Sequence, residues 1–299
     1  MDQDPVSTPI VFIHIGGPPP PYTHIAIEQA RRWNPNNPII FISSVIEDYG
    51  AKETWVDIAN IPMSAAHQRF RDVTPLEGFW KWTTERLFVL EDWMRWKGVK
   101  DCIHFEYDNM IYQDLSAMIP LLRRISPGLS TTFQGQGGNQ DSVRACFSVV
   151  YCSSVDALTN FTGFLASNRL NSDEMQLGGL YWQDTPEECS FFATTPVGVT
   201  LKSETCRHWL EDERFKEVGC IFDASNYGQY LGGVDPKYHV NNTTPGFINP
   251  DCDFRADQYE YVWITDDVGR RYPTIKDKEG RQWKIANLHI HCKRLHEFV

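Results

Sequence analysis

The sequence predicts an α/β fold in which helices flank a mostly parallel central sheet, and two observations support this prediction. Residues 9–15 (PIVFIHI) form an apolar, β-branched run of strand length, followed by a Gly-Gly-Pro turn, a helical stretch over residues 22–33 and a second apolar run at residues 39–42. Strand, turn, helix and strand at this spacing are typical of a βαβ unit, whose strands run parallel. A strand that is apolar on both faces is typical of a sheet covered on both sides.

The clearest helical signal follows in the first half. Thr74 can cap a helix, Pro75 suits the first helical position, and Glu77 can reach back to complete a capping box. The helix then continues through an aromatic-rich stretch to Lys97 and ends at Gly98, the residue type that most often terminates helices.

The second half of the chain shows a less regular order of helix and strand signals. We therefore expect it to form a part of the fold with mixed helices and strands. Residues 134–138 (QGQGG) lack the spacing of phosphate-binding glycine motifs, so we interpret them as a loop. The other expected strands are residues 55–58, 99–105, 147–151, 220–222, 261–265 and 283–291, and the other expected helices are residues 114–125, 154–166 and 172–180.

Composition and charge narrow the classes of function. The chain has 299 residues, with 28 Lys and Arg against 39 Asp and Glu, and a net charge of −11. Nucleic-acid binding needs a basic face, so the excess of acid argues against nucleic acid as the main partner. The stretch from residue 270 onward is the exception, with eight basic and three acidic residues. It is either a solvated basic face or a favourable place for a small phosphate-bearing ligand.

Three further features of the sequence bear on the cellular compartment of the protein. No apolar run approaches the ~20 residues that a membrane-spanning helix needs, and the acidic N-terminal residues do not resemble a signal peptide. The eight cysteines include no C-x-x-C pair. We therefore expect a cytoplasmic protein with reduced, structural thiols and no transmembrane segment.

The first candidate site is the triplet Glu106-Tyr107-Asp108, which comes directly after an expected buried strand. Both carboxylates can reach one hard divalent cation, and Mg²⁺ and Mn²⁺ favour such oxygen ligands. The same acid-x-acid form occurs, for example, at residues 2–4 and 251–253, and of these three triplets only the one at 106–108 has an apolar strand leading into it. The alternative is a capping or surface pair of acids.

The second candidate site is the segment His289-Ile290-His291-Cys292-Lys293. On a strand, side-chain alternation would place His289, His291 and Lys293 on one face. One imidazole could then complete a metal site, and Lys293 could meet a phosphate group as a point charge. The alternative is that the histidines are structural.

The third candidate is Asp223, which a short strand delivers into a stretch of small residues (FDASNYGQYLGGVDP). Small residues let the backbone approach a ligand closely, so Asp223 is a candidate general base. The alternative is an N-cap ahead of a glycine-ended helix. Asp173 and Glu174 form a competing acid pair, which we interpret as complementing the dipole of the helix that they begin.

Four segments together resemble the nucleotide-sugar-dependent glycosyltransferases of the GT-A fold, in particular a group of bacterial and large-virus glycosyltransferase-like proteins. The segments are IVFIHIGGPPPPY, TTERLFVLEDWMRWKGVKDCIHFEYDNMIY, IFDASNYGQYLGGVDP and NLHIHCKRL. Their order along one chain is more specific than any of them alone. The resemblance implies a single GT-A domain over residues 1–299, with a Rossmann-like central sheet and a smaller mixed C-terminal part. About residues 7–130 would bind the nucleotide sugar, and about residues 131–299 the acceptor.

The resemblance also implies roles for particular residues. Glu106 and Asp108 would bind the Mn²⁺ or Mg²⁺ that holds the donor diphosphate, with Asp108 the surer ligand because many GT-A enzymes have Asp where this chain has Glu. A C-terminal histidine would add a metal ligand, with His291 the first choice and His289 the second, and Lys293 would contact phosphate. The first strand and its turn would form the nucleoside pocket, which implicates Ile13, His14, Ile15 and Gly16.

The expected activity is transfer of a sugar from a UDP- or GDP-sugar to a hydroxyl acceptor such as a glycan. The metal and Lys293 would stabilise the leaving diphosphate. Asp223 would be the base of an inverting enzyme, whereas a retaining enzyme would not need that base. The alternatives are a nucleotide-sugar hydrolase or nucleotidyltransferase, which shares the metal–diphosphate chemistry, and a non-catalytic module that binds sugar or nucleotide.

Overall fold

The computed structural model describes residues 8–45, 54–136, 143–167, 172–202, 207–211, 217–235, 237 and 242–299. Its centre is a seven-stranded sheet in the order β3-β2-β1-β4-β7-β6-β8. β7 runs antiparallel to both of its neighbours, and the other strands of the sheet run parallel to one another. The predicted α/β fold with a mostly parallel central sheet is therefore confirmed. The strands are β1 (Ile10–His14), β2 (Ile39–Ser43), β3 (Thr54–Asp57), β4 (Cys102–Phe105), β6 (Leu129–Gln136), β7 (Val143–Cys152) and β8 (Cys189–Phe192).

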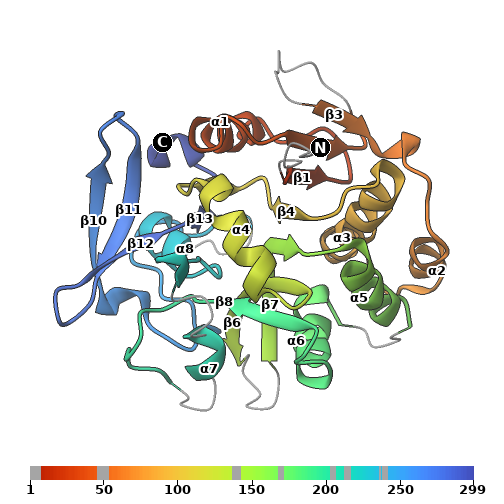
Figure 1. Ribbon diagram of the computed structural model, residues 1–299. Helices are drawn as coiled ribbons and strands as arrows, with labels where there is room; N and C mark the ends of the chain where they lie inside the picture. The colour runs from red at the N-terminus through yellow and green to blue at the C-terminus, as the bar shows by residue number, and fades with distance from the viewer. Residues whose placement is uncertain are drawn as a thin grey trace.

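Helices cover both faces of this sheet, as the fully buried strands require (Figure 1). Alternate residues of β1 point to opposite faces. Val11 and Ile13 pack in one apolar cluster with α3 (Gly78–Lys97) and α5 (Val155–Ser167). Ile10 and Phe12 pack in a second cluster with α4 (Leu115–Ile125). The other helices are α1 (Thr23–Trp33), α2 (Ala65–Val73), α6 (Glu174–Asp184), α7 (Arg207–Leu210) and α8 (Tyr227–Gly232).

Two smaller sheets complete the described part of the chain. One has the order β10-β11-β12-β9 and stands at the side of the molecule opposite α2, α3 and α5 (Figure 1). The other pairs β5 with β13 and joins the middle of the chain to its C-terminal end. These strands are β5 (Asn109–Ile111), β9 (Cys220–Ile221), β10 (Glu260–Thr265), β11 (Arg271–Lys276), β12 (Gln282–Ile285) and β13 (Asn287–His289).

The start of α3 differs from the sequence prediction. The helix begins at Gly78, and Glu77 is its N-cap without a side-chain hydrogen bond, so the predicted capping box is wrong. Thr74 instead follows α2, and its Oγ1 accepts a hydrogen bond from the backbone N–H of Leu76 at 3.2 Å. The predicted end is correct, because Gly98 takes a left-handed conformation with φ of +64°.

Two further predictions about strands were wrong. The expected strand over residues 283–291 is two strands, β12 and β13, with different partners. The expected loop at residues 134–138 is in part strand, because β6 continues to Gln136, and residues 137 and 138 lie outside the described residues. A Cβ at Gly135 would lie 2.1 Å from the backbone oxygen of Asp251, so this glycine serves close backbone packing.

Two expectations about location can be compared with the structure. Among the described residues, no helix is both long and apolar enough to cross a bilayer. The seven cysteines within the described ranges are unpaired and buried, in agreement with structural thiols.

Candidate functional site

The Glu106–Asp108 triplet forms a tight turn at the carboxyl end of β4. The backbone N–H of Asn109 donates to the carbonyl oxygen of Glu106 at 3.0 Å, and β5 begins at once at Asn109. β4 lies beside β1 in parallel, so the carboxyl ends of these two strands share one edge of the sheet. The turn therefore presents both carboxylates where open α/β sheets bind their ligands.

His289 reaches this turn through the pairing of β13 with β5. The antiparallel register sets His289 opposite Asn109, directly after the triplet. The backbone N–H of Ile290 then donates to the carbonyl oxygen of Asp108 at 2.9 Å and extends the contact by one residue. Short as it is, this two-stranded sheet brings together segments that are far apart in the sequence.

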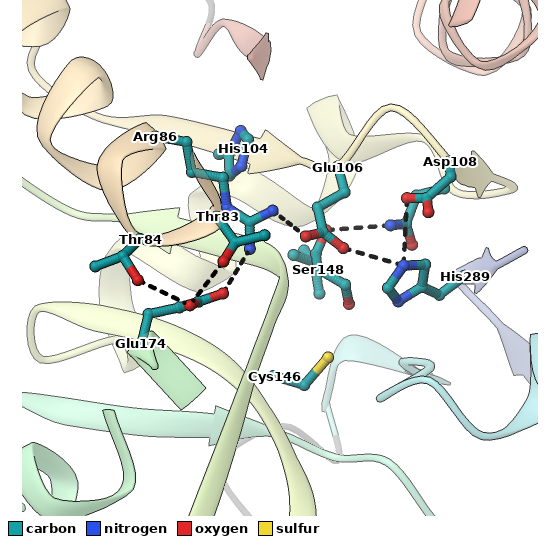
Figure 2. A network of polar contacts seen from close by, with 12 residues as sticks. Thr83, Thr84, Arg86, His104, Glu106, Asp108, Cys146, Ser148, Glu174 and His289 are labelled. Carbon is teal, nitrogen blue, oxygen red and sulfur yellow. Dashed lines mark hydrogen bonds and ion pairs between the residues drawn. The ribbon is translucent and has the colours of Figure 1, made fainter. Parts of the chain in front are cut away.

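Both carboxylates converge on one nitrogen of His289. Its Nε2 lies 3.0 Å from Oε2 of Glu106 and 3.2 Å from Oδ1 of Asp108. Figure 2 shows the imidazole between the two acids. One donor atom from each of these three residues lies within 4.8 Å of the others.

The outer oxygens of the two carboxylates are held by cations. Arg86, from α3, donates through Nη1 to Oε1 of Glu106, and Lys293 donates through Nζ to Oδ2 of Asp108. Each carboxylate thus uses one oxygen for a basic side chain and turns the other towards His289. The contact between Lys293 and Asp108 agrees with the sequence prediction that these segments meet, whereas no spacing in the sequence pointed to Arg86.

Arg86 also links the site to a buried acid on α6. Its Nη2 lies 3.5 Å from Oε1 of Glu174, and Oε2 of Glu174 accepts hydrogen bonds from Thr83 and Thr84 at 3.0 and 3.1 Å. Figure 2 shows Arg86 between the two glutamates. Asp173 is the N-cap of α6 and accepts a hydrogen bond from the N–H of Gln176. Glu174 has a further role: it pairs with the guanidinium of Arg86, and the same guanidinium pairs with Glu106.

Opposite charges outweigh burial in setting the ionisation of this cluster. Burial alone would raise the pKa of Glu106, but Arg86 and His289 bring it far below its usual range. Burial likewise opposes the charge of Asp108, and His289 and Lys293 lower its pKa well below the usual value. The two carboxylates in turn raise the pKa of His289, although burial lowers it. In this arrangement both acids are ionised and share the proton of His289.

His291, the first choice of the sequence analysis, lies beside the cluster rather than on the carboxylates. Its ring centroid is 4.2 Å from that of His289, and its Nδ1 lies 3.1 Å from Nε2 of Gln229. Burial, and then the positive charges of His289 and Lys293, keep its pKa well below the usual value. The predicted strand alternation did not bring these residues together, because β13 ends at His289 and Lys293 has a positive φ of 61°.

Asp223 is fully buried, and backbone N–H groups surround its carboxylate. Oδ1 accepts from Asn226 and Tyr227 at 2.7 and 2.9 Å, and Oδ2 accepts from Gly228 and His289 at 2.8 and 2.9 Å. These bonds tie the start of α8 to β13, as the capping alternative expects. A Cβ at Gly228 would lie 2.1 Å from the backbone oxygen of His289, so the small residue here serves close packing of two backbones. The role of Asp223 as a base stays a prediction.

Ser225 holds the other ring nitrogen of His289. Its Oγ lies 2.7 Å from Nδ1 of His289, and Sγ of Cys146 lies 3.3 Å from the same hydroxyl. A contact at Nδ1 fixes which nitrogen faces the carboxylates, because it determines the ring orientation. Ser225 has a positive φ of 63°, an uncommon conformation for a residue other than glycine.

The residues of the predicted nucleoside pocket lie at the end of β1, where some belong to the hydrophobic core and others contact the acidic turn or α3. Ile13 is buried in the core, with Ile15 packed against it. His14 packs edge-on against Tyr107 of the acidic turn, with ring centroids 5.0 Å apart. Tyr107 in turn stacks on Tyr22 at 6.1 Å. Gly16, with φ of +98°, lies against α3. The end of β1 therefore adjoins the Glu106–Asp108 turn.

The donor set fits a hard divalent cation. Carboxylate oxygens suit Mg²⁺ and Mn²⁺, and an imidazole adds a nitrogen ligand that Mn²⁺ also accepts. Arg86, Lys293 and Ser225 contact the remaining polar atoms of the three candidate ligands, and such outer contacts orient metal ligands. A cation bound here would replace the proton of His289, since an imidazole must be neutral to coordinate.

A search of solved structures finds several glycosyltransferases among the chains similar to this one. Mouse xyloside xylosyltransferase 1 has 9% identity and a TM-score of 0.48, and the match covers 71% of this chain and 92% of that one. An active-site mutant of LgtC has 10% identity and a TM-score of 0.40, covering 68% and 82%. PaToxG glycosyltransferase has 11% identity and a TM-score of 0.34, covering 61% and 71%. No protein-family model and no curated protein matches the sequence.

Proposed function

We propose that this protein is a metal-dependent glycosyltransferase. It takes a sugar from a nucleoside-diphosphate sugar at the Glu106–Asp108–His289 site and transfers it to a hydroxyl group, such as that of a glycan. The observation that supports this proposal is the meeting of the β4 turn with the C-terminal segment, where two carboxylates, an imidazole and Lys293 converge. This convergence lies at the carboxyl ends of parallel strands, the usual ligand-binding edge of an open α/β sheet.

Charge explains how these residues would act. When the sugar–phosphate bond breaks, negative charge grows on the leaving diphosphate, and Mn²⁺ or Mg²⁺ bound to Glu106, Asp108 and His289 would neutralise part of it. Lys293, held beside Asp108, would place a second positive charge at the same point. Its pKa is raised by Asp108 despite burial, so it stays protonated at neutral pH.

The donor would lie with its nucleoside against the end of β1. His14, Tyr107 and Tyr22 form a connected aromatic wall beside the acidic turn. A UDP- or GDP-sugar placed there would have its diphosphate at the Glu106–Asp108 turn. His291, whose Nδ1 faces Gln229, would support His289 from behind in this arrangement.

The direct test is Asp108→Asn, with Asp251→Asn as a matched control. Asp251 belongs to another acid-x-acid triplet, at residues 251–253, and it is exposed. We expect the wild-type protein to bind UDP or GDP in a Mn²⁺-dependent way and to transfer sugar from the corresponding nucleotide sugar. Asp108→Asn should lose both properties while its thermal unfolding stays cooperative, and Asp251→Asn should keep both. Full transfer by Asp108→Asn, or by the wild type with chelator present, contradicts the proposal.

The same assay separates the alternatives. Release of free sugar at a rate that no acceptor changes indicates a nucleotide-sugar hydrolase. Metal-dependent nucleotide binding without turnover of any nucleotide sugar indicates a binding module.

The general base is tested separately with Asp223→Asn. Loss of transfer with unchanged donor binding supports the base role that the sequence analysis assigned to this residue. Equal losses of transfer and donor binding, together with a lower unfolding temperature, support the structural role that its four backbone hydrogen bonds describe.

A further inference from the structure

Large aromatic side chains are exposed at the start of α3. Phe79 is 51% exposed, Trp80 44% and Trp82 40%. Rings of this size gain much free energy when they are covered, and neighbouring exposed apolar side chains usually mark a binding surface. Their position relative to the Glu106–Asp108–His289 site indicates what they bind.

One face of α3 connects these rings to the site. Residues three and four apart on a helix are neighbours, so Phe79, Trp82 and Arg86 lie in one row. Arg86, only 7% exposed, forms the inner end of the row and contacts Glu106. Exposure then rises outward through Trp82 to Phe79. The row therefore runs from the Glu106–Asp108–His289 site to the surface of the molecule.

Trp82 is held against the other wall of the site. A Cβ built on Gly16 would lie 2.7–2.8 Å from three carbons of the indole, namely Cδ2, Cε2 and Cζ2. Nearly equal distances to three ring atoms mean that the ring lies with its face towards the backbone of Gly16. Gly16 comes two residues after β1 ends and belongs to the proposed nucleoside pocket. Trp82 therefore bridges the end of β1 and α3 and still exposes part of its ring.

We propose that Trp82, continued outward by Phe79, is the platform on which the acceptor sugar rests, an inference that depends on the proposed function. A pyranose ring has an apolar C–H face that packs on an aromatic ring, while its hydroxyl groups stay hydrated or form hydrogen bonds. The diphosphate of the donor belongs at the buried cluster, so the surface end of the row is left for the acceptor. Two rings about one helical turn apart suit the successive units of a glycan better than a single nucleobase.

The test uses a glycan array with labelled protein, in the presence of Mn²⁺ and of UDP or GDP. Trp82→Ala should lower retention on the glycans that wild type binds by about tenfold or more, as the loss of a central aromatic anchor does elsewhere. Trp82→Phe keeps an aromatic face and should retain most of the binding. Trp96→Ala is the matched control, because Trp96 is also 40% exposed on α3 but lies about 21 Å further along the helix.

Nucleotide affinity, measured by calorimetry on the same variants, separates this inference from the proposed function. We expect Trp82→Ala to bind UDP and GDP as wild type does. Weaker nucleotide binding would make Trp82 a nucleobase platform and overturn the inference. Equal glycan retention by Trp82→Ala, or no glycan retained by the wild type, overturns it too. If wild type binds neither nucleotide but Trp82→Ala still loses glycans, the proposed function fails and the sugar subsite stands.

Discussion

Ser225 shows how a single residue can determine the geometry of the site. Its hydroxyl contacts Nδ1 of His289 and leaves Nε2 facing Glu106 and Asp108. It does so from a left-handed conformation that costs free energy in any residue with a side chain. An unfavourable backbone conformation next to a candidate metal ligand leads us to expect that the hydroxyl matters for binding.

Ser225→Ala and Ser225→Gly separate the hydroxyl from the backbone conformation. Both variants should bind Mn²⁺ about 10- to 100-fold more weakly, the usual cost of losing an outer partner of a metal ligand. Ser225→Gly should be the more stable of the two by about 1 kcal/mol, because glycine accepts a positive φ. Calorimetric titration with Mn²⁺ and urea unfolding measure these two effects. Mn²⁺ affinities equal to that of wild type would show that Ser225 does not orient His289.

Loss of Arg86 should lower the stability of the fold strongly. Arg86→Met leaves Glu106 and Glu174 buried without the cation they share, and breaking a buried pair in this way destabilises by about 3–5 kcal/mol. Burial already raises the pKa of Glu174 to about 6, even with Arg86 beside it.

Urea unfolding measures this loss, with Arg124→Met as the control. Arg124 pairs with Glu217 where their side chains are 61% and 64% exposed, and the loss of such a pair costs less than about 1 kcal/mol. Equal, small effects of the two substitutions would mean that Arg86 does not hold the glutamates together.

Among the secondary-structure elements, those with apolar runs could be predicted and those with buried polar runs could not. The apolar patterns of β1, β2 and α1 identified these elements at almost the observed residues. β6 was not predicted, because the polar residues Ser130, Thr131 and Thr132 do not give the apolar pattern of a buried strand. All three are fully buried, and Thr131 satisfies its hydroxyl on the carbonyl oxygens of Cys146 and Val149. Only the neighbouring strand supplies these acceptors, so the local sequence could not reveal them.

The residues that meet in the candidate site could be predicted only in part. Glu106 and Asp108 could be found because they follow a recognisable strand. The choice between His289 and His291 depended on how long the last strand is, and β13 ends at His289 after pairing with the three residues of β5. Arg86 lies within α3 and Glu174 is the first residue of α6, so only the tertiary contact between these two helices brings them together.

The contact between α2 and α3 should make stability depend on pH. His67 of α2 is buried, with Nδ1 2.7 Å from Asp92 and Nε2 3.2 Å from Glu85, both on α3, and Glu85 also pairs with Arg71 of α2. Burial opposes its charge, but the two acids raise its pKa above the ordinary 6.5. The folded protein therefore holds this proton more tightly than the unfolded chain does. The stabilisation is complete below pH 6.5 and is lost as pH rises through the raised pKa.

His67→Gln tests this dependence, because it removes the charge and keeps a polar side chain. We expect the difference in unfolding free energy between wild type and variant to be larger at pH 6 than at pH 9, as measured by urea unfolding at both values. A difference that stays constant, or that grows towards pH 9, would show that His67 contributes nothing through its proton.

Across the whole molecule, two segments that are far apart in the sequence meet at one candidate site. The C-terminal end is fixed against the first half of the chain, because the hydroxyl of Tyr112 donates to the backbone oxygen of Phe298 at 2.7 Å. The β5–β13 sheet and the contact between Lys293 and Asp108 lie along the same seam. A chain with a net charge of −11 places Arg86 and Lys293 beside the two acids of this site. This local positive charge would favour the anionic diphosphate of the proposed donor.

Anomalous diffraction from crystals grown with Mn²⁺ and UDP tests this claim most directly. We predict a manganese peak in contact with Oε2 of Glu106, Oδ1 of Asp108 and Nε2 of His289. The diphosphate should lie on that peak and beside Nζ of Lys293. A manganese peak away from these three atoms, or a diphosphate bound without contact to Lys293, would contradict the account.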